Sequence, residues 1–326
     1  MRQAEVKSGK SVVIDEVVGV DLHGSRLDRA VAVVGGVSRS VATKLVDSGA
    51  VLVNGEIVTL RTKLLFAQQQ LSIKITEKFP TAKLVADSAV EFAVVHDDDD
   101  VIVIDKPSGL VVHPGAGHPD KTLVNGLLAR YPEISAVGEP FRPGIVHRLD
   151  RGTSGLMVIA RSVHAYRHLT AQLHSRGPKR VYTTLVLGSL KADSGVIEAP
   201  IGRSNKNPTR MAVQQKGKPA VTHYRVCCRY TNPLSATLLS CRLETGRTHQ
   251  IRVHLQAISH PVLGDDTYSS SRYDDNSAST TELGLHRPFL HAAALTFRHP
   301  VSEQQVHFES ELPADLKEIL SRLQTP

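Results

Sequence analysis

The pattern of apolar and polar positions predicts a chain built from many strands and few helices. Short runs rich in valine, isoleucine, leucine and alanine are typical of strands, at residues 91–97, 101–107, 156–162, 181–188, 223–230, 236–244 and 292–300. Helical patterns lie at residues 122–130, 163–175, 249–257 and 313–323. Because strands and helices do not alternate strictly, we predict an α+β fold with a large mixed, mainly antiparallel sheet.

The first quarter of the chain has a pattern of its own. Residues 25–34 and 38–47 predict two short helices, with Ser38 as the N-cap of the second helix. Asn54-Gly55 then interrupts an alternating stretch, which predicts a two-residue β-hairpin. Two helices followed by a tight hairpin are expected to form a small α/β module.

These differences divide the chain into regions. We predict a small domain at residues 1–76 with its core at about 25–74, a linker at 77–89 and a larger domain at 90–326. Positive charge is denser in the first 84 residues than in the rest, which is typical of a module that faces a polyanion. Polar, low-complexity residues at 268–285 predict a surface loop.

Composition narrows the class of protein. Hydrophobic residues make up 41% of the 326 residues and charged residues 22%, as in globular proteins with a full core. No apolar run is long enough to cross a membrane and the first residues do not resemble a secretory signal, so we expect a cytoplasmic protein. The three cysteines have no framework spacing and indicate reduced thiols. A net charge of +7 permits a polyanionic partner.

The stretch GIVHRLDRGTSGLMVIARS, residues 144–162, contains the first candidate site. A polar loop joins two apolar segments, and Gly152 and Gly155 allow it to bend tightly. Asp150 lies between Arg148 and Arg151, and flanking cations favour the ionised carboxylate that a nucleophile or a base requires. A surface loop with salt bridges is the alternative interpretation of these residues alone.

A second candidate site lies in RLETGRTHQIRVHLQAISHPVLGD, residues 242–265. A strand again leads into a helix, which Thr245 or Thr248 is expected to cap, and the free N–H groups of the first turn could hold a phosphate. A guanidinium from this stretch would hold a nearby carboxylate ionised and oriented. A helix with ordinary surface cations is the alternative. The basic residues concerned are Arg247, His249, Arg252 and His254.

The N-terminal run SRLDRAVAVVGGVSRSVATKLVDSGAVLVNGE, residues 25–56, resembles the alpha-L RNA-binding motif of ribosomal and RNA-modifying proteins. Where that motif usually has glycine-aspartate before its last strand, this chain has Ala67-Gln68-Gln69-Gln70. The alternative is a solvated basic helix pair without a ligand. The resemblance implies RNA contacts by Arg26, Ser38, Arg39, Lys44 and Asn54.

The larger domain resembles the RluA family of pseudouridine synthases over about residues 90–312. The catalytic-aspartate motif of that family is similar to HRLDRGTSGLMVIA, and further segments match in the family's order: KPSGLVVHP, KRVYTTLV, ETGRTHQIRVHL, HPVLGD and LHAAALTF. An alpha-L module in front of the synthase domain resembles the domain arrangement of the branch that modifies large-subunit ribosomal RNA. The resemblance implies an isomerase with RNA as partner, no cofactor, no metal, and no membrane or obligate protein partner.

The resemblance also implies catalytic roles. Asp150 stands where the family has its essential aspartate, and Tyr182 where it has the tyrosine that lies against the target base. Arg247 matches the arginine that pairs with the aspartate, and Arg180 replaces a lysine that the family often has two residues before the tyrosine. Asp150 is expected either to attack C1′ of the uridine or to remove its C2′ proton, and both routes stay open.

Substrate contacts follow from the same motifs. The target base has to leave its stack in the RNA, and Arg148 matches a residue that fills the vacated space. His147, Thr153 and Ile251 are further residues that we expect to bind the substrate.

The sequence also contains motifs that resemble other kinds of functional site. GAGHPDKT at residues 115–122 is close to a phosphate-binding loop, but Asp120 would repel phosphate and is expected instead to cap the following helix. The histidines and cysteines have no metal-binding spacing, and the aspartates at 97–100 favour a solvated turn over a calcium site. A transfer-RNA pseudouridine synthase, a non-catalytic RNA-binding assembly factor and a base-removing glycosylase remain as alternative functions.

Overall fold

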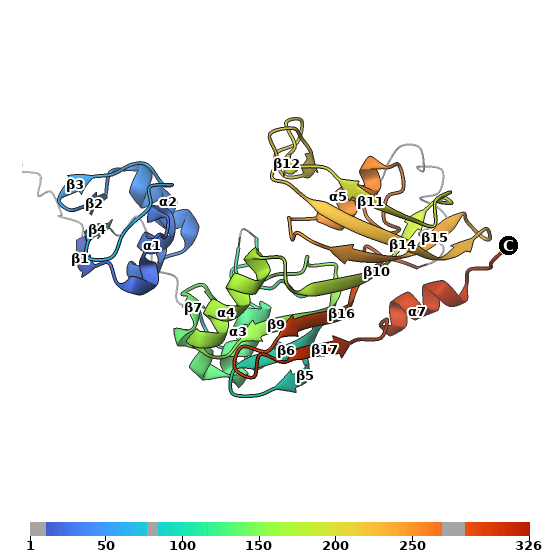
Figure 1. Ribbon diagram of the computed structural model, residues 1–326, viewed down its shortest axis with the longest axis horizontal. Coiled ribbons are helices and arrows are strands. Elements are labelled where there is room, and N and C mark those ends of the chain that lie inside the picture. The colour runs from blue at the N-terminus through green and yellow to red at the C-terminus, as the bar shows by residue number, and fades with distance from the viewer. Residues whose placement is uncertain (1–10, 77–83, 116, 269–283) are drawn as a thin grey trace, which may run out of the picture. The chain divides into compact units, whose positions relative to one another are not determined.

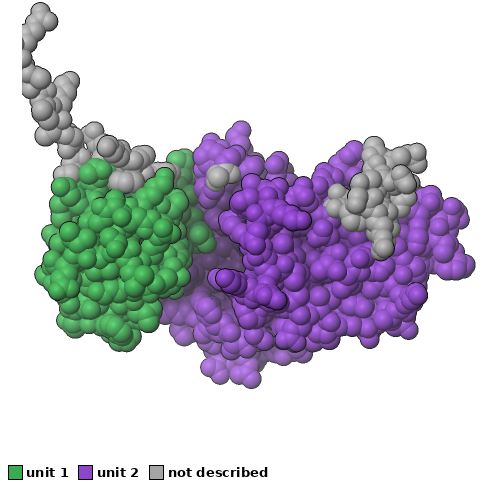
Figure 2. Space-filling view, turned by 90° about the horizontal axis from the view of Figure 1, so that it is seen from above, with its two compact units in different colours: residues 1–86, 135–143 green, residues 87–134, 144–326 purple. Residues whose placement is uncertain are grey.

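The computed structural model describes residues 11–76, 84–115, 117–268 and 284–326. Two compact units divide the chain: the first comprises residues 1–86 and 135–143, and the second comprises residues 87–134 and 144–326 (Figure 2). Residues 269–283 of the predicted surface loop at 268–285 and residues 77–83 of the predicted linker at 77–89 lie outside the described residues. At the two ends of that predicted loop, Tyr268 and Leu285 are buried rather than on the surface.

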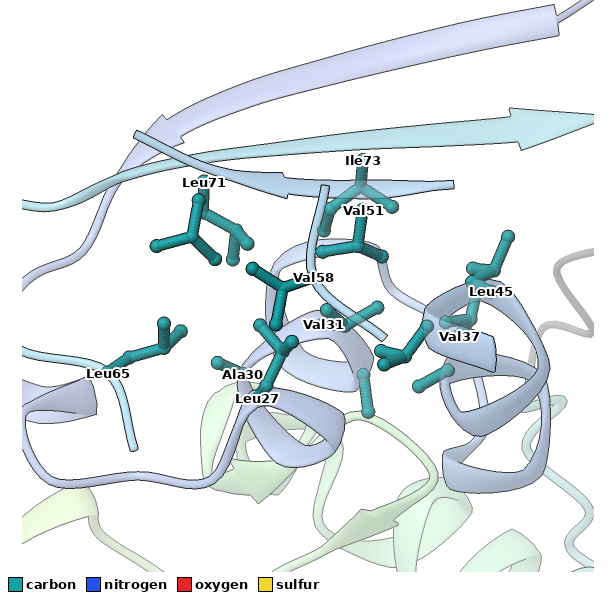
Figure 3. Close-up of a cluster of buried hydrophobic side chains, with 14 of the residues drawn as sticks. Leu27, Ala30, Val31, Val37, Leu45, Val51, Val58, Leu65, Leu71 and Ile73 are labelled. Carbon is teal, nitrogen blue, oxygen red and sulfur yellow. The ribbon is translucent and has the colours of Figure 1, made fainter. Parts of the chain in front are cut away.

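The first unit combines two helices with a four-stranded antiparallel sheet in the order β1-β4-β2-β3. Its apolar core lies between the helices and the sheet and includes Leu27, Val31 and Ile73, which are fully buried (Figure 3). The elements are β1 (Ser11–Val17), η1 (Val20–Leu22), α1 (Leu27–Val34), α2 (Arg39–Asp47), β2 (Val51–Val53), β3 (Glu56–Ile57) and β4 (Gln70–Thr76).

Local signals in the sequence explain the turns of this unit. Ser38 is the N-cap of α2, where its hydroxyl accepts the N–H of Val41. Asn54 and Gly55 have φ of 52° and 82°, as the predicted two-residue hairpin requires. Gln68 has φ 72°, so it adopts before β4 the left-handed conformation for which glycine is better suited. The predicted helices, cap and hairpin are confirmed.

The second unit is built on a nine-stranded sheet (Figure 1). The strand order is β11-β14-β15-β10-β16-β9-β6-β5, with β17 paired to β16, and within the described residues only β9 and β16 pair in parallel. The predicted α+β fold with a large, mainly antiparallel sheet is confirmed. The strands are β5 (Ala93–Asp97), β6 (Val101–Lys106), β9 (Ser154–Ala160), β10 (Lys179–Leu187), β11 (Ser194–Glu198), β14 (Val221–Tyr230), β15 (Ala236–Leu243), β16 (Leu290–Arg298) and β17 (Gln305–Glu309).

The remaining elements are helices and two separate two-stranded sheets, of which the β7–β8 pair belongs to the first unit. The helices are α3 (Leu123–Arg130), α4 (Val163–His174), α5 (Gln250–Ala257) and α7 (Ala314–Ser321), with the short helix η2 at Pro132–Ala136. The short strand pairs are β7 (Gly138–Glu139) with β8 (Arg142–Pro143) and β12 (Ile201–Arg203) with β13 (Met211–Val213). Helix α4 packs on β9, whereas α5 packs on β13 and β14.

One predicted cap is wrong. Asp120 does not cap α3, because Thr122 is the residue directly before the first helical position. The N–H and hydroxyl of Thr122 both donate to Oδ1 of Asn125, at 2.9 and 2.6 Å.

The parallel junction between β9 and β16 shapes the centre of the sheet. Gly155 has φ 112° there, and a Cβ on it would lie 2.3 Å from the carbonyl oxygen of Ala292, so the two strands approach too closely for any side chain. The loop that enters β9 therefore ends against β16, and β10 lies on the other side of β16. Ser154 and Gly155 of β9 thereby pair with His291 and Ala292 of β16, which are distant from them in the sequence.

Candidate active site

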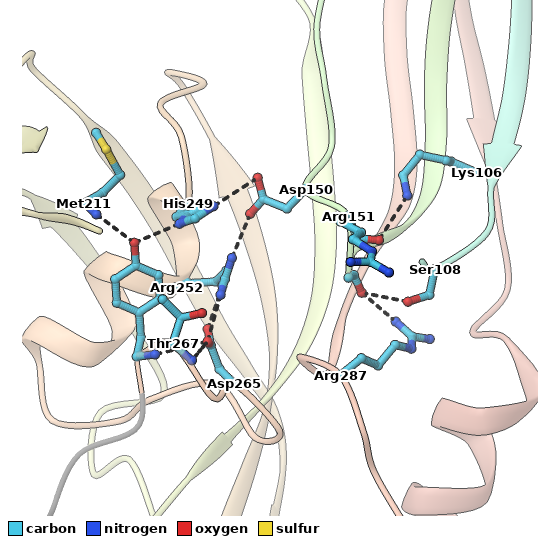
Figure 4. A network of polar contacts seen from close by, with 12 residues as sticks. Lys106, Ser108, Asp150, Arg151, Met211, His249, Arg252, Asp265, Thr267 and Arg287 are labelled. Atoms are coloured by element: carbon cyan, nitrogen blue, oxygen red, sulfur yellow. Dashed lines mark hydrogen bonds and ion pairs between the residues drawn. The ribbon is translucent and has the colours of Figure 1, made fainter. Parts of the chain in front are cut away.

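Asp150 lies in a loop that is tied to the sheet just before β9. The Thr153 N–H donates to the Asp150 carbonyl oxygen at 3.1 Å, which closes the turn. Nε2 of His147 accepts the Val158 N–H of β9 at 3.1 Å. The loop is thereby fixed at both ends, and the Asp150 carboxylate, which is 18% exposed, faces α5 (Figure 4).

Arg252 of α5 is the arginine that contacts Asp150. Its Nη1 lies 3.3 Å from Oδ2 of Asp150, while its Nε and Nη2 donate to Asp265 at 2.6 and 2.8 Å. The Asp265 side chain is fully buried and also accepts the N–H groups of Thr267 and Tyr268. Asp265 thus fixes the guanidinium, and the guanidinium orients the carboxylate of Asp150.

The expected pairing of Arg247 with Asp150 is corrected by this arrangement. Arg247 precedes α5, and its Nε donates to the carbonyl oxygen of Pro219 at 3.1 Å. The prediction that Thr245 or Thr248 caps this helix is also wrong, because α5 begins directly after His249, which is its N-cap residue. The Gln250 side chain accepts the Arg247 N–H, so that group is not free for an anion.

His249 faces Asp150 from the start of α5 in a strained conformation. Its φ is 56°, in the left-handed region that residues other than glycine rarely adopt, and its Nε2 lies 3.9 Å from Oδ1 of Asp150. The Tyr268 hydroxyl accepts the Met211 N–H at 3.0 Å and lies 2.8 Å from Nδ1 of His249. With one phenolic proton and no other partner among the described residues, Tyr268 donates to Nδ1.

The tautomer of His249 follows from these contacts. Burial lowers the pKa of His249, against the opposing effect of Asp150, so the ring is neutral at pH 7. Because Nδ1 accepts a hydrogen bond from the Tyr268 hydroxyl, Nε2 carries the ring hydrogen and directs it at Asp150. Each carboxylate oxygen of Asp150 therefore faces one N–H group.

Tyr182 lies on β10, across β16 from the strand that follows Asp150. Its side chain is almost fully buried at 6% exposure. Burial raises the pKa of the phenol, and the Asp150 carboxylate raises it further, so Tyr182 is protonated at neutral pH. Tyr182 therefore presents an aromatic ring with a neutral hydroxyl.

Lys106 is a buried cation beneath the loop that carries Asp150, and it was not among the residues predicted from the sequence. It is fully buried at the end of β6 and donates to the carbonyl oxygens of Pro107, Leu110 and Arg151 at 2.8, 2.9 and 3.4 Å. Burial lowers the pKa of Lys106 to about 7, although Asp150 raises it. A lysine at the end of an apolar strand, directly before a proline, was the available signal.

The remaining predicted substrate residues have different surroundings. Arg148 is exposed, whereas Thr153 and Ile251 are 2% and 3% exposed. Burial, together with the charge of Arg180, lowers the pKa of His147 to about 3, so this ring is neutral. His147 therefore acts as a hydrogen-bond acceptor for the backbone of β9.

The predicted RNA-facing residues of the first unit are held by local contacts. Arg26 and Arg39 both donate to Asp28, at 2.9 to 3.2 Å. Burial of Asp28 is outweighed by these hydrogen bonds, which lower its pKa. Ser38 caps α2, Lys44 is exposed, and Asn54 is exposed with its side chain accepting the N–H of Gln70.

Two further properties apply to the described part of the chain. No group of three or more potential metal ligands occurs among the residues searched. Within the same residues, no helix has both the length and the apolar character needed to cross a membrane.

Comparisons with known proteins agree with this architecture. Residues 100–257 match the family model described as RNA pseudouridylate synthase, and residues 25–68 match the S4 domain. Ribosomal large subunit pseudouridine synthase D of Haemophilus ducreyi is 40% identical, with 94% of both chains covered. The protein of the same name from Nitrosomonas europaea is 43% identical, with 95% of this chain and 88% of its own covered. The solved structure of human RNA pseudouridylate synthase domain containing 1 has the same fold, with a TM-score of 0.57 at 24% identity over 74% of this chain and 91% of its own.

The fold and the extent of these matches define the class as RNA pseudouridine synthases. Within that class, the chain belongs to the RluA family and carries an S4 domain, the alpha-L RNA-binding module, at its N-terminus. It is an enzyme of the isomerase type.

Proposed function

We propose that the protein isomerises specific uridines of large-subunit ribosomal RNA to pseudouridine. The observation that supports this substrate most directly is similarity over almost the whole chain to relatives named for that reaction, with the S4 domain included. Free cysteines and a ribosomal substrate favour a cytoplasmic location. The S4 module, with Arg26, Ser38, Arg39, Lys44 and Asn54, supplies RNA contacts outside the active site.

The reaction begins with extrusion of the target nucleotide from the folded RNA. Unstacking costs a few kcal/mol, and exposed Arg148 offsets part of that cost by filling the vacated space. The flipped uracil lies against Tyr182, with Ile251 and Thr153 at the margins of the same site. His147 holds the loop on β9 while the RNA binds.

Asp150 then breaks the bond between N1 and C1′. Its carboxylate either attacks C1′ or removes the C2′ proton, and the developing positive charge at C1′ favours a nearby carboxylate in both cases. The freed uracil turns so that C5 joins C1′, which displaces Asp150 from C1′ in the first route, or is accompanied by return of the C2′ proton from Asp150 in the second. C5 then loses its proton and N1 gains one, so that the composition of the RNA is unchanged. Tyr182 lies beside the base to assist removal of the C5 proton. No redox or group-transfer partner is required, so the chain needs no cofactor.

Arg252 and His249 prepare Asp150 for this step. Arg252 keeps Oδ2 ionised and fixed, and Nε2 of His249 lies 3.9 Å from Oδ1, beyond hydrogen-bond distance, so Oδ1 is available to the sugar. Arg247, which contacts Pro219 instead, is available to the RNA backbone at the start of α5.

Site mapping of pseudouridine in ribosomal RNA tests this function. Cells that lack the protein should lose pseudouridine at one or more large-subunit positions, and the wild-type gene should restore them. Asp150→Asn should restore none while folding and binding RNA normally, because the central carboxylate is gone. Loss of pseudouridine only from transfer RNA would assign the other substrate, and restoration by Asp150→Asn would indicate a non-catalytic role for Asp150. Unchanged RNA mass separates isomerisation from a glycosylase, which releases a base.

A further inference from the structure

A buried arginine lies two residues before Tyr182, and its side chain has no hydrogen-bond partner among the described residues. Arg180 of β10 is 8% exposed, and its Nε is enclosed without a hydrogen bond. Within the described residues, no hydrogen bond or ion pair reaches this side chain. The other buried cations are compensated, since Lys106 donates to three carbonyl oxygens and Arg252 to two carboxylates. A buried cation without an acceptor is costly, so its presence points to an acceptor that binds from outside.

The position of Arg180 connects it to the active site. Alternate residues of a strand point to the same face, so Arg180 and Tyr182 share one face of β10, which pairs regularly with β15. The guanidinium lies against Gly246, where an added Cβ would be 2.8 Å from Nη1. Gly246 belongs to the turn between β15 and α5, the helix that carries Arg252. The charge of Arg180 is also felt at His147 and Tyr182.

We propose that Arg180 binds a backbone phosphate of the RNA, next to the nucleotide whose base lies against Tyr182. The site consists of the guanidinium, the wall of β10 and the side-chain-free space at Gly246. This inference rests on the proposed function, because the RNA substrate supplies the phosphate. It assigns Arg180 to substrate binding and leaves the chemical step to Asp150.

The chemistry of the side chain favours a phosphate over a base edge. A guanidinium carries a permanent charge and a planar set of donors that match two phosphate oxygens at once. A uracil carbonyl is neutral and would leave the buried charge uncompensated. A backbone phosphate neutralises it for any sequence around the target.

Three variants and one matched control test the proposal. Arg180→Met removes the charge, Arg180→Lys keeps it without the planar fork, and Gly246→Ala keeps arginine but displaces its flexible end. Arg242→Met is the control: Arg242 is exposed and pairs with Val181 on the neighbouring strand, so its side chain lies on the opposite face of the sheet from Arg180. All are compared with wild type by binding to in vitro transcribed large-subunit ribosomal RNA at several salt concentrations, and by thermal unfolding without RNA.

Arg180→Met should weaken RNA binding about tenfold and reduce the slope of log affinity against log salt by about one. Without RNA its midpoint of unfolding should equal or exceed that of wild type, because an uncompensated buried charge is removed. Gly246→Ala should also lower the affinity for RNA. Arg180→Lys should have an affinity between those of wild type and Arg180→Met. Arg242→Met should change neither the affinity for RNA nor the salt slope.

An unchanged salt slope in both Arg180→Met and Gly246→Ala would overturn the proposal, whatever the stability of the variants. If Arg180→Met does not fold, Gly246→Ala and Arg180→Lys decide by the same slope. The proposed function is tested separately by whether wild type forms pseudouridine in the transcript. Turnover with an unchanged slope rejects the phosphate site alone, and a reduced slope without turnover rejects the function alone.

Discussion

Arg252 contacts Asp150 through a single atom, with Nη1 3.3 Å from Oδ2, because Asp265 occupies the Nε and Nη2 of the same guanidinium. The shorter contacts are those to Asp265, at 2.6 and 2.8 Å, so Asp265 determines where the guanidinium lies. Asp150 is held on one oxygen, and its Oδ1 accepts no hydrogen bond from the described residues, with Nε2 of His249 at 3.9 Å. A fixed cation beside a partly exposed carboxylate is the arrangement that a pre-organised nucleophile or base requires.

The two arginines of the α5 region should differ sharply in their effect on turnover. Arg252→Ala should lower kcat about a hundredfold, because Asp150 loses its orientation and its neighbouring charge. Arg247→Ala should change kcat by no more than about twofold, with any effect expressed in RNA affinity. Single-turnover assays at saturating RNA separate the two quantities. A larger kcat effect for Arg247→Ala would restore the assignment made from sequence.

Asp265 should affect both stability and catalysis without touching the substrate. Asp265→Asn breaks a buried ion pair and should lower the free energy of unfolding by about 3–5 kcal/mol, with kcat falling alongside. Arg287 and Asp315 form a similar two-bond pair, but the Asp315 side chain is 52% exposed. Asp315→Asn should therefore cost no more than about 1 kcal/mol. Denaturant unfolding measures both, and equal losses would contradict the anchoring role of Asp265.

His249 should show a trade between stability and activity. Asparagine tolerates the left-handed conformation better than histidine, so His249→Asn should unfold at the same or a higher temperature while kcat falls about tenfold. Tyr268→Phe should lower kcat in the same direction, because Nδ1 loses the donor that selects the tautomer. Glu303→Asn is the matched control, since Glu303 also has a positive φ but lies in the β16–β17 turn. If the role of His249 were purely structural, His249→Asn would unfold at a lower temperature than wild type.

Lys106 should make the stability of the second unit depend on pH. Its pKa is about 7 in the folded chain against an ordinary 10.5, so between these values the unfolded chain binds more protons. Stability should therefore rise with pH from about 7 to about 10.5, and below pH 7 the slope from this group should vanish. Lys106→Met should remove the rise. The free energy of unfolding of wild type and of Lys106→Met is measured at pH 6, 8 and 9.5. A difference between the two proteins that does not change with pH would show that Lys106 stays charged throughout, against the prediction.

Much of the fold followed from local patterns. The runs at residues 101–107 and 156–162 became β6 and β9, because fully buried strands read as continuous apolar segments. Strands β11 to β13 and β17 were not predicted, since their burial alternates or is slight and gives little apolar signal. The cap of α3 was misplaced because Asp120 and Thr122 both suit the position, and only the backbone conformation distinguishes them.

The sequence by itself indicated the family, the presence of an RNA-binding module before the synthase domain, and Asp150 as the candidate catalytic residue, because ordered motifs and hydrophobic periodicity are properties of the linear chain. The tertiary structure decided which arginine meets that carboxylate. Arg247 and Arg252 are chemically alike and five positions apart in one motif, so spacing does not separate them. The start of α5 after His249 directs Arg252 to Asp265 and Asp150 and leaves Arg247 on Pro219. The sequence also did not reveal that Nε of Arg180 has no acceptor among the described residues, because only the fold shows which groups surround a side chain.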